Sequence, residues 1–234
     1  MPLAPSALIY LVFVGVFLPY VSLRSAQRLR AGTLAMPPRR AVFTRTLIML
    51  VGLGALAILT GRSLGLPILA PHVPTARDLG AAAIAAALVG GWAPIGWRLR
   101  SPERRRRMLA LVPQTPGERA LWFALTLAAG FFEEIIYRGV LFAIVMYLVR
   151  NWGIAALICA AVFAAVHAIQ GLRSAIVVGV IAFLFQALVR VTGSLYEAMA
   201  VHFLYDLVLG LVMGARAQAV MAAADAGGVR TTPE

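Results

Sequence analysis

The sequence contains no lysine and a single cysteine, and charged residues make up only 13% of its 234 positions. A soluble domain carries about a quarter charged residues, so a soluble globular fold is excluded. One cysteine, Cys159, cannot form a disulfide framework or a cysteine-based metal site. Its position in an apolar run is typical of a small buried hydrophobic residue.

The sequence consists largely of long apolar runs: 62% of its residues are hydrophobic, and its mean hydropathy is +0.89. A membrane-spanning helix needs about 20 such residues. The runs lie at roughly 7–23, 42–59, 79–97, 120–149, 152–168, 175–191 and 195–214. The fourth is too long for one simple span, so it is either a tilted long helix or a span that continues as a half-helix. We predict an all-α, polytopic transmembrane helix bundle with seven, or eight, spans.

Arginine supplies all of the positive charge, and 21 arginines against nine acids give a net charge of +12. This balance also suits nucleic-acid binding, but the arginines gather between apolar runs, which is the positive-inside pattern. Segments 24–45 and 98–119 carry six and seven of them, and segment 61–78 carries two. We expect no nucleic-acid partner, the two rich segments in the cytoplasm and the N-terminus outside. The run 104–107 fits a solvated loop better than a site for anionic lipid headgroups.

The first apolar run lacks a basic segment before it, and its arginines follow it, which is typical of an uncleaved span and not of a signal peptide. We therefore expect an integral protein of a bacterial inner or plasma membrane. The chain has room for one membrane domain. We divide it into an N-terminal transmembrane region with basic loops (1–118), a core (119–214) and a flexible tail (215–234).

Few strongly polar side chains remain at membrane depth. Charged groups there are costly and mark functional sites. Glu197 lies nearer a boundary, where it can reach water, and His72 lies in a loop, so we expect neither to take part. The remaining candidates are Glu133, Glu134, Arg138, His167, His202 and Asp206.

The spacing of these residues predicts two pairs. Glu134 and Arg138 are four residues apart and face the same side of a helix within ion-pair reach. Glu133 points about 100° away, so it can face a cavity while Arg138 holds Glu134. The two carboxyl groups can then differ in pKa. His202 and Asp206 repeat the four-residue spacing, and the carboxylate can fix the histidine tautomer. Phe163 and His167 also share a face, which predicts an aromatic wall beside the imidazole.

Each group also has a structural alternative. A Glu–Arg pair can staple helices, His167 can be an interfacial histidine, and His202 with Asp206 can be an interhelical hydrogen-bonding pair. All three together would require the two intramembrane histidines to coincide with the intramembrane acids by chance.

Three motifs occur in an order that resembles a known family. They are FFEEIIYRG, which is similar to E-E-x-x-x-R; FAAVH at 163–167, similar to F-x-x-x-H; and TGSLYEAMAVHFLYD, similar to H-x-x-x-N/D. The ordered set, over roughly 119–214, resembles the CPBP family of CAAX-protease and bacteriocin-processing intramembrane proteases.

The resemblance implies an intramembrane endopeptidase whose cavity opens toward the cytoplasm and whose substrate is a membrane-anchored protein or peptide, including prenylated CAAX proteins. By the family's roles, Glu133 activates water with help from His167, and Glu134 with Arg138 supports the site. His202 and Asp206 would stabilise the oxyanion. Prenyl-protein proteases carry Asn at the last position, and Asn can donate where ionised Asp cannot. Asp206 is therefore expected to orient His202, to ligate a metal or to be protonated.

Two questions stay open. Glu133, His167 and His202 could hold Zn²⁺ as a His₂Glu set with an open position, although the favoured version is a metal-free, glutamate-activated water. The alternative functions are a non-catalytic membrane scaffold or immunity factor of the same fold, and a proton-coupled transporter that uses the polar groups as a relay.

Overall fold

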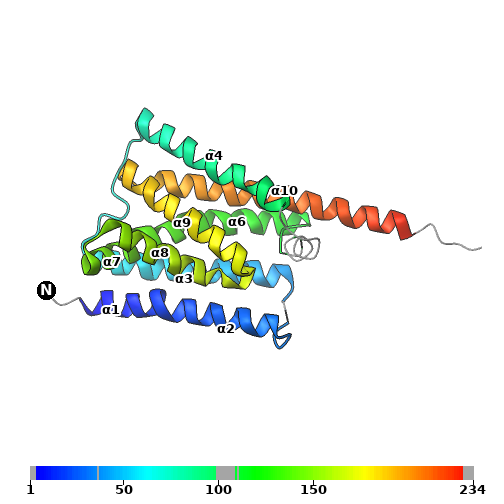
Figure 1. Cartoon of the computed structure of the whole chain (residues 1–234), viewed down its shortest axis with the longest axis horizontal. Helices are drawn as coiled ribbons and strands as arrows, with labels where there is room; N and C mark the ends of the chain where they lie inside the picture. Colours follow the sequence, from blue (N-terminus) through cyan, green and yellow to red (C-terminus); the bar gives the residue numbers. More distant parts are fainter. Residues whose placement is uncertain (1–3, 36, 99–108, 110, 229–234) are drawn as a thin grey trace, which may run out of the picture.

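The computed structural model describes residues 4–35, 37–98, 109 and 111–228. Every regular element within these ranges is a helix. The helices lie roughly parallel to one long axis, and the C-terminal helix extends beyond the others (Figure 1). The predicted all-α bundle is therefore confirmed.

The described helices form seven rods, several of which contain more than one helical type. In chain order the elements are α1 (Pro5–Val12), η1 (Phe13–Phe17) and α2 (Leu18–Arg30); α3 (Arg39–Ser63); α4 (Ala76–Arg98); α6 (Pro116–Glu133), η2 (Glu134–Leu141) and α7 (Phe142–Val149); α8 (Trp152–Val166), followed by η3 (Ala168–Gln170); α9 (Leu172–Thr192); and α10 (Tyr196–Gly228).

Five of these rods are long and apolar enough to cross a membrane, namely Pro5–Arg30, Arg39–Ser63, Ala76–Arg98, Leu172–Thr192 and Tyr196–Ala219. Helix α8 is apolar but shorter. The long fourth run is helical without a break from Pro116 to Val149, so the described residues contain no separate half-helix there. Helix α10 continues to Gly228, well into the segment predicted to be a flexible tail.

The outer faces of the rods are apolar. Ile48 on α3, Ile84 on α4 and Leu157 on α8 are each about two-thirds exposed, at 67%, 65% and 64%. Large exposed apolar surfaces are unusual in soluble monomers, whereas hydrocarbon lipid tails cover them at no cost. The surface therefore agrees with the composition in indicating an integral membrane protein.

Local sequence signals explain where the central rod begins and ends. Thr115 and Glu118 form a capping box, in which each side chain accepts a backbone N–H at the first turn of α6. Such a cap satisfies two of the N–H groups that a helix start leaves without partners. At the other end Arg150 adopts a left-handed conformation with φ of 51°, and Asn151 caps α8 by accepting Ile154 N–H at 3.0 Å.

Small residues allow the central rod to approach its neighbours closely. The ring of Phe132 lies against Gly54 of α3, where an added Cβ would come within 2.0 Å of it. Gly210 of α10 receives Trp122 in the same way. In lipid, close backbone approach of this kind is what drives helix association. Gly214, one turn further along α10, lies against the Pro113 carbonyl with equally little room.

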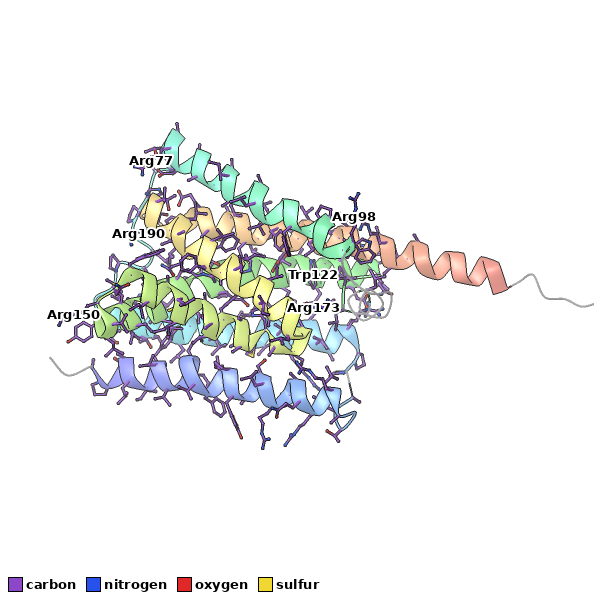
Figure 2. All side chains as sticks on the ribbon, viewed as in Figure 1. Arg77, Arg98, Trp122, Arg150, Arg173 and Arg190 are labelled. Carbon is purple, nitrogen blue, oxygen red and sulfur yellow. The ribbon has the colours of Figure 1, made fainter. Side chains whose placement is uncertain are left out.

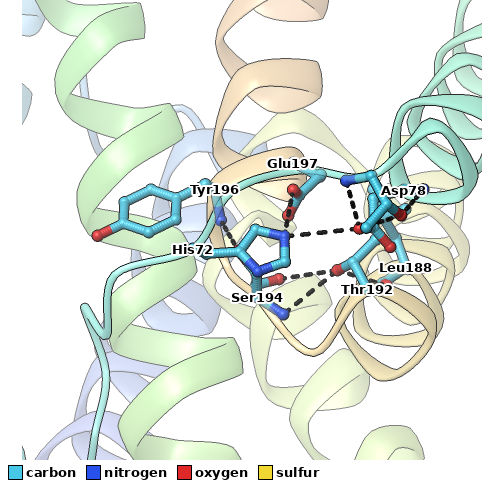
Figure 3. A network of polar contacts seen from close by, with 8 residues as sticks. His72, Asp78, Leu188, Thr192, Ser194, Tyr196 and Glu197 are labelled. Atoms are coloured by element: carbon cyan, nitrogen blue, oxygen red, sulfur yellow. Dashed lines mark hydrogen bonds and ion pairs between the residues drawn. The ribbon is translucent and has the colours of Figure 1, made fainter.

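The connection between α3 and α4 is fixed to the end of the bundle. Ile68 lies against Gly61 and Gly139, and an added Cβ at Gly139 would be 2.6 Å from Ile68 Cγ2. His72 Nε2 lies 3.0 Å from Glu197 Oε1 and 3.7 Å from Asp78 Oδ2, and Figure 3 shows the imidazole between them. Glu197 is 6% exposed. The expectation that Glu197 reaches water was therefore wrong, because His72 provides a partner inside the protein.

The labelled arginines separate into two groups. Arg98 and Arg173 lie at one end of the bundle, and Arg77, Arg150 and Arg190 lie at the other (Figure 2). The α2–α3 connection lies at the same end as Arg98 (Figure 1). The described connection after α2 and Arg98, which belong to the two arginine-rich segments, thus lie at one end. The predicted basic run 104–107 lies outside the described residues.

Candidate functional site

The central rod changes helix type where its acidic pair occurs. Glu133 is the last residue of α6, and Glu134 is the first residue of the π-helical segment η2. Single π-turns within α-helices occur frequently at functional sites, because the extra residue re-aims the side chains that follow. Ile135, Ile136, Val140 and Leu141 of this segment are fully buried. The segment therefore holds its polar groups in the middle of the largest apolar core.

Glu134 is fully buried and contacts a guanidinium and an imidazole. Its Oε1 lies 3.2 Å from Arg138 Nη1 and 2.8 Å from His202 Nδ1 on α10. The predicted proximity of Glu134 and Arg138 is present, and His202 is a second partner that the spacing within one helix does not reveal. Glu134 therefore bridges two helices.

Aromatic rings surround the cation. The Arg138 guanidinium carbon lies 4.5 Å from the centroid of Phe163 and 5.7 Å from that of Phe185. Tyr137 meets Phe163 edge to face at 4.8 Å. Ring faces attract cations, and more strongly where water is excluded. Arg138 is 4% exposed. Because little water reaches it, the Glu134 carboxylate and the two ring faces are what stabilise its charge.

His202 lies where three carboxylates meet. A carboxylate that faces a ring nitrogen at 2.8 Å accepts its proton, so Nδ1–H donates to Glu134. The other nitrogen, Nε2, lies 3.7 Å from Glu133 Oε2 and 3.5 Å from Asp206 Oδ2. Asp206 was expected to fix the tautomer of His202. In the structure the shorter, buried contact is with Glu134, which is better placed for that task.

Glu133 differs from Glu134 in its surroundings. Its side chain is 13% exposed, whereas the Glu134 side chain is 0% exposed. His167, His202, Asp206 and Arg138 all lie within electrostatic range of it. Glu133 is thus the carboxylate of the pair that is partly exposed and lies near His202 Nε2, with His167 within electrostatic range.

His167 follows the last residue of α8. Its Nδ1 lies 2.8 Å from the Phe163 carbonyl oxygen, which can only accept, so Nδ1 carries the proton and Nε2 is left as an acceptor in the neutral form. The imidazole also packs on the Phe163 ring, with centroids 4.4 Å apart. The aromatic wall predicted from the spacing of these two residues is present.

Close packing of α6 on α10 makes the contacts to His202 possible. An added Cβ at Gly130 would lie 2.8 Å from the Phe203 backbone nitrogen and 3.0 Å from the Met199 carbonyl. Gly130 precedes Glu133 by about one turn, and Met199 and Phe203 flank His202. Trp122 Nε1–H donates to the Asp206 carbonyl at 3.2 Å and holds the next turn of α10.

Among the residues that the structure describes, no group of three or more His, Cys, Asp or Glu side chains is arranged to hold a metal ion. His202 presents Nδ1 to Glu134, and His167 presents Nδ1 to the Phe163 carbonyl. Each imidazole thus has Nε2 left for a further partner, and a hydrogen-bonded Nδ1 is also what a metal-binding histidine has.

An apolar hollow of about 340 Å³ lies between α2 and the segment around the end of α8. Its lining includes residues on both sides of His167 in the chain together with α2, namely Leu23, Arg30, Ala164, Ala165, Ala168 and Ile176. Arg30 is the one charged residue in the lining of this hollow. The hollow therefore suits an apolar chain more than a polar ligand.

Phe185, which contacts both His202 and Arg138, could not be selected from the sequence. It lies on α9 in an apolar run, and a phenylalanine there is more often simply part of the core. His72 and Glu197 were set aside because one lies in a loop and the other near a span's end. Their pairing depends on how the 64–75 connection folds back.

A family model covers the segment that contains this constellation. Residues 115–208 match the model described as type II CAAX prenyl endopeptidase Rce1-like. The match confirms the resemblance to the CPBP family that the three ordered motifs indicate. No curated protein matches the chain, and no solved structure does.

Proposed function

From the Rce1-like CAAX endopeptidase match over residues 115–208, we propose that this protein is an intramembrane endopeptidase that hydrolyses peptide bonds of membrane-associated proteins or peptides. The observation that carries the proposal is the meeting of Glu133, Glu134 and His202 across α6, η2 and α10. A base beside a histidine at membrane depth is what hydrolysis there requires.

Glu133 is the general base in this mechanism. Its carboxylate removes a proton from water, and the water oxygen attacks the carbonyl carbon of the scissile peptide bond. The neutral form of His167 has an accepting Nε2, which orients the same water. After the tetrahedral intermediate forms, the proton held by Glu133 passes to the leaving amine nitrogen and the C–N bond breaks.

His202 stabilises the negative charge that develops on the carbonyl oxygen. When both of its nitrogens carry protons, Nδ1–H donates to Glu134 and Nε2–H is directed to the side where Glu133 and Asp206 lie. A donor fixed in place before the reaction stabilises an oxyanion without reorganisation, and one such donor is worth about 10²–10³ in rate.

Glu134 and Arg138 support this arrangement without touching the substrate. Arg138 and a doubly protonated His202 balance the charges of Glu134 and Asp206. Glu133 is then the carboxylate whose proton can be exchanged during turnover. Placing two carboxylates in different surroundings is a general way to assign them different tasks.

The substrate class is a membrane-anchored or lipidated chain. The 340 Å³ hollow at the end of α8 is lined by alanine and aliphatic side chains together with Arg30, which suits an apolar segment or a lipid chain with a polar end. His167 precedes Arg173, which lies at the arginine-rich end (Figure 2). By the positive-inside rule that end faces the cytoplasm, so the substrate reaches the site from that side.

The test is cleavage of a membrane-anchored peptide by the purified protein in detergent, read by mass spectrometry of the two products. The peptide is offered with and without a prenyl group and with and without a chelator. We expect one defined cut that persists in chelator. Loss of cleavage on chelation, with recovery on adding Zn²⁺, would replace the metal-free mechanism by a metal-dependent one. Binding without cleavage would favour a scaffold.

A further inference from the structure

The N-terminal rod α1–η1–α2 lies outside the residues that match the family model, yet it touches both segments of the candidate site. Tyr10 Oη donates to the Ile136 carbonyl oxygen at 3.0 Å. Ser22 Oγ donates to the Val166 carbonyl oxygen at 2.5 Å. Ile136 lies in η2 between Glu134 and Arg138, and Val166 directly precedes His167. Two hydroxyl groups of one rod thus hold the backbone at two parts of the site.

Tyr10 is 1% exposed and belongs to the same core as Ile135, Ile136 and Val140. A buried hydroxyl without a hydrogen bond is costly, so the phenol group and the carbonyl constrain one another strongly. A carbonyl oxygen has two lone pairs, and Ile136 can accept from Tyr10 as well as from the helix backbone. The bond therefore fixes one turn of η2 in rotation and along its axis.

The rotation of this turn decides whether the site exists. A π-helical turn holds one more residue than an α-helical turn, and successive residues in an α-helix are rotated by about 100°. If η2 relaxed to α-helix, the helix that precedes it in the chain and the helix that follows it would rotate relative to one another by about that angle. The Glu134–Arg138 pair is possible in either helix type because the two residues are four apart. What would be lost is the register of this pair against α10, where Glu134 now contacts His202 at 2.8 Å.

Ser22 acts at the end of α8. The helix stops at Val166, and His167 adopts a non-helical conformation with φ of −89° and ψ of 7°. A chain end of this kind has fewer backbone constraints than a helix interior. The Ser22 bond to the Val166 carbonyl restricts the last peptide group before the imidazole, and so restricts where His167 points.

We propose that Tyr10 and Ser22 are positioning residues for hydrolysis, and that the N-terminal rod holds the π-helical register of η2 and the orientation of His167. The inference rests on the proposed peptidase function for its rate effect. It also makes a claim about backbone order that does not depend on activity.

Tyr10→Phe tests the proposed role of Tyr10 at η2, because it keeps the ring and removes only the hydroxyl. The matched control is Tyr20→Phe on the same rod, where the side chain is exposed at 56%. We expect kcat of Tyr10→Phe to fall roughly three- to tenfold with KM within about twofold, as for a lost buried hydrogen bond. Tyr20→Phe should match wild type. Loss of folded protein without a change in kcat per folded molecule would overturn the inference.

Amide hydrogen exchange in detergent provides the readout without activity. In Tyr10→Phe we expect faster exchange confined to residues 134–141, and in Ser22→Ala faster exchange near residues 164–168. Unchanged exchange in both segments, or a uniform increase over all helices, would contradict the positioning role. If the wild type cleaves no peptide but these local changes occur, the peptidase function fails and the structural part of the inference stands.

Discussion

Glu134 Oε1 and His202 Nδ1 lie 2.8 Å apart and join the π-helical turn of the central rod to α10. Both side chains are buried, and the same Glu134 oxygen also faces Arg138 at 3.2 Å. One carboxylate atom therefore sets the position of a histidine and balances a buried guanidinium. The family-matched segment is held together at its centre by this contact.

The first prediction concerns the buried pair itself. Glu134→Met leaves Arg138 without its carboxylate, so we expect a loss of about 3–5 kcal/mol of stability, the usual cost of removing one partner of a buried ion pair. Replacing both residues by Met removes the unbalanced charge together with its partner. The double variant should therefore be more stable than the single one in thermal unfolding in detergent. A double variant that is less stable than Glu134→Met would contradict this reading.

The second prediction concerns Asp206. Its side chain is 34% exposed and lies 3.5 Å from His202 Nε2, so it holds the imidazole less firmly than Glu134 does. An amide can donate to an oxyanion whereas an ionised carboxylate cannot. We expect Asp206→Asn to keep kcat within about tenfold of wild type or to exceed it. The new amide donor can offset the lost charge, because one oxyanion donor contributes about 10²–10³ in rate. Complete loss of cleavage in a folded Asp206→Asn protein would show that the charge is essential.

The third prediction concerns acid stability at the start of α6. Burial raises the pKa of Glu118, but the backbone N–H groups of Gln114 and Thr115 and the side chain of Arg39 outweigh it, and the net effect lowers the pKa. A lowered folded-state pKa stabilises the protein above the ordinary glutamate pKa of about 4.3. That stabilisation is lost as the pH falls through the lower folded-state pKa.

Glu118→Gln removes this titration while preserving a side chain that can take part in a capping box. The melting temperature of the variant should depend less on pH below about 4.3 than that of the wild type. Parallel acid curves for the two proteins would show that Glu118 does not contribute. Arg39→Met is a companion variant, because Arg39 Nε lies 3.1 Å from Glu118 Oε1 and its loss should reduce the same dependence.

The fourth prediction concerns the connection between α3 and α4. His72→Ala leaves the buried Glu197 carboxylate without the partner it now has at 3.0 Å, and we expect a loss of about 1–3 kcal/mol. Proteolysis of residues 64–75 should become faster, with kcat little changed. His72→Gln keeps a donor for Glu197 and should be closer to wild type. An equal loss in both variants would mean that packing of the ring, and not the contact, holds the connection.

Much of the fold follows from the sequence because lipid allows few alternatives. Backbone groups in hydrocarbon must bond internally, so apolar runs such as 42–59 and 175–191 had to be helices, and α3 and α9 contain them. Helix spacing likewise placed Glu134 near Arg138. What spacing within one helix cannot show is contact between helices. The bond from Glu134 to His202 depends on the close approach at Gly130, where α6 meets α10.

The π-helical turn and the two hydroxyl contacts were also beyond sequence reasoning. Nothing in the letters EIIYRGVL distinguishes a π-turn from an α-helix, because the choice depends on what packs against it. Tyr10 lies in an apolar run and was indistinguishable from an ordinary aromatic core residue. Its bond to Ile136, 126 positions away, becomes visible only when α1 is placed against η2.

Cleavage by Glu133→Gln tests the central claim most directly. The matched control is Glu197→Gln, which removes a carboxylate that lies outside the proposed chemistry and contacts His72. In single-turnover cleavage of the same membrane-anchored peptide, Glu133→Gln should be slower than wild type by about 10²–10⁴, the usual contribution of a general base. Glu197→Gln should remain within about tenfold, because its carboxylate takes no part in proton transfer. A folded Glu133→Gln protein that cleaves at the wild-type rate would contradict the assignment of Glu133 as the base.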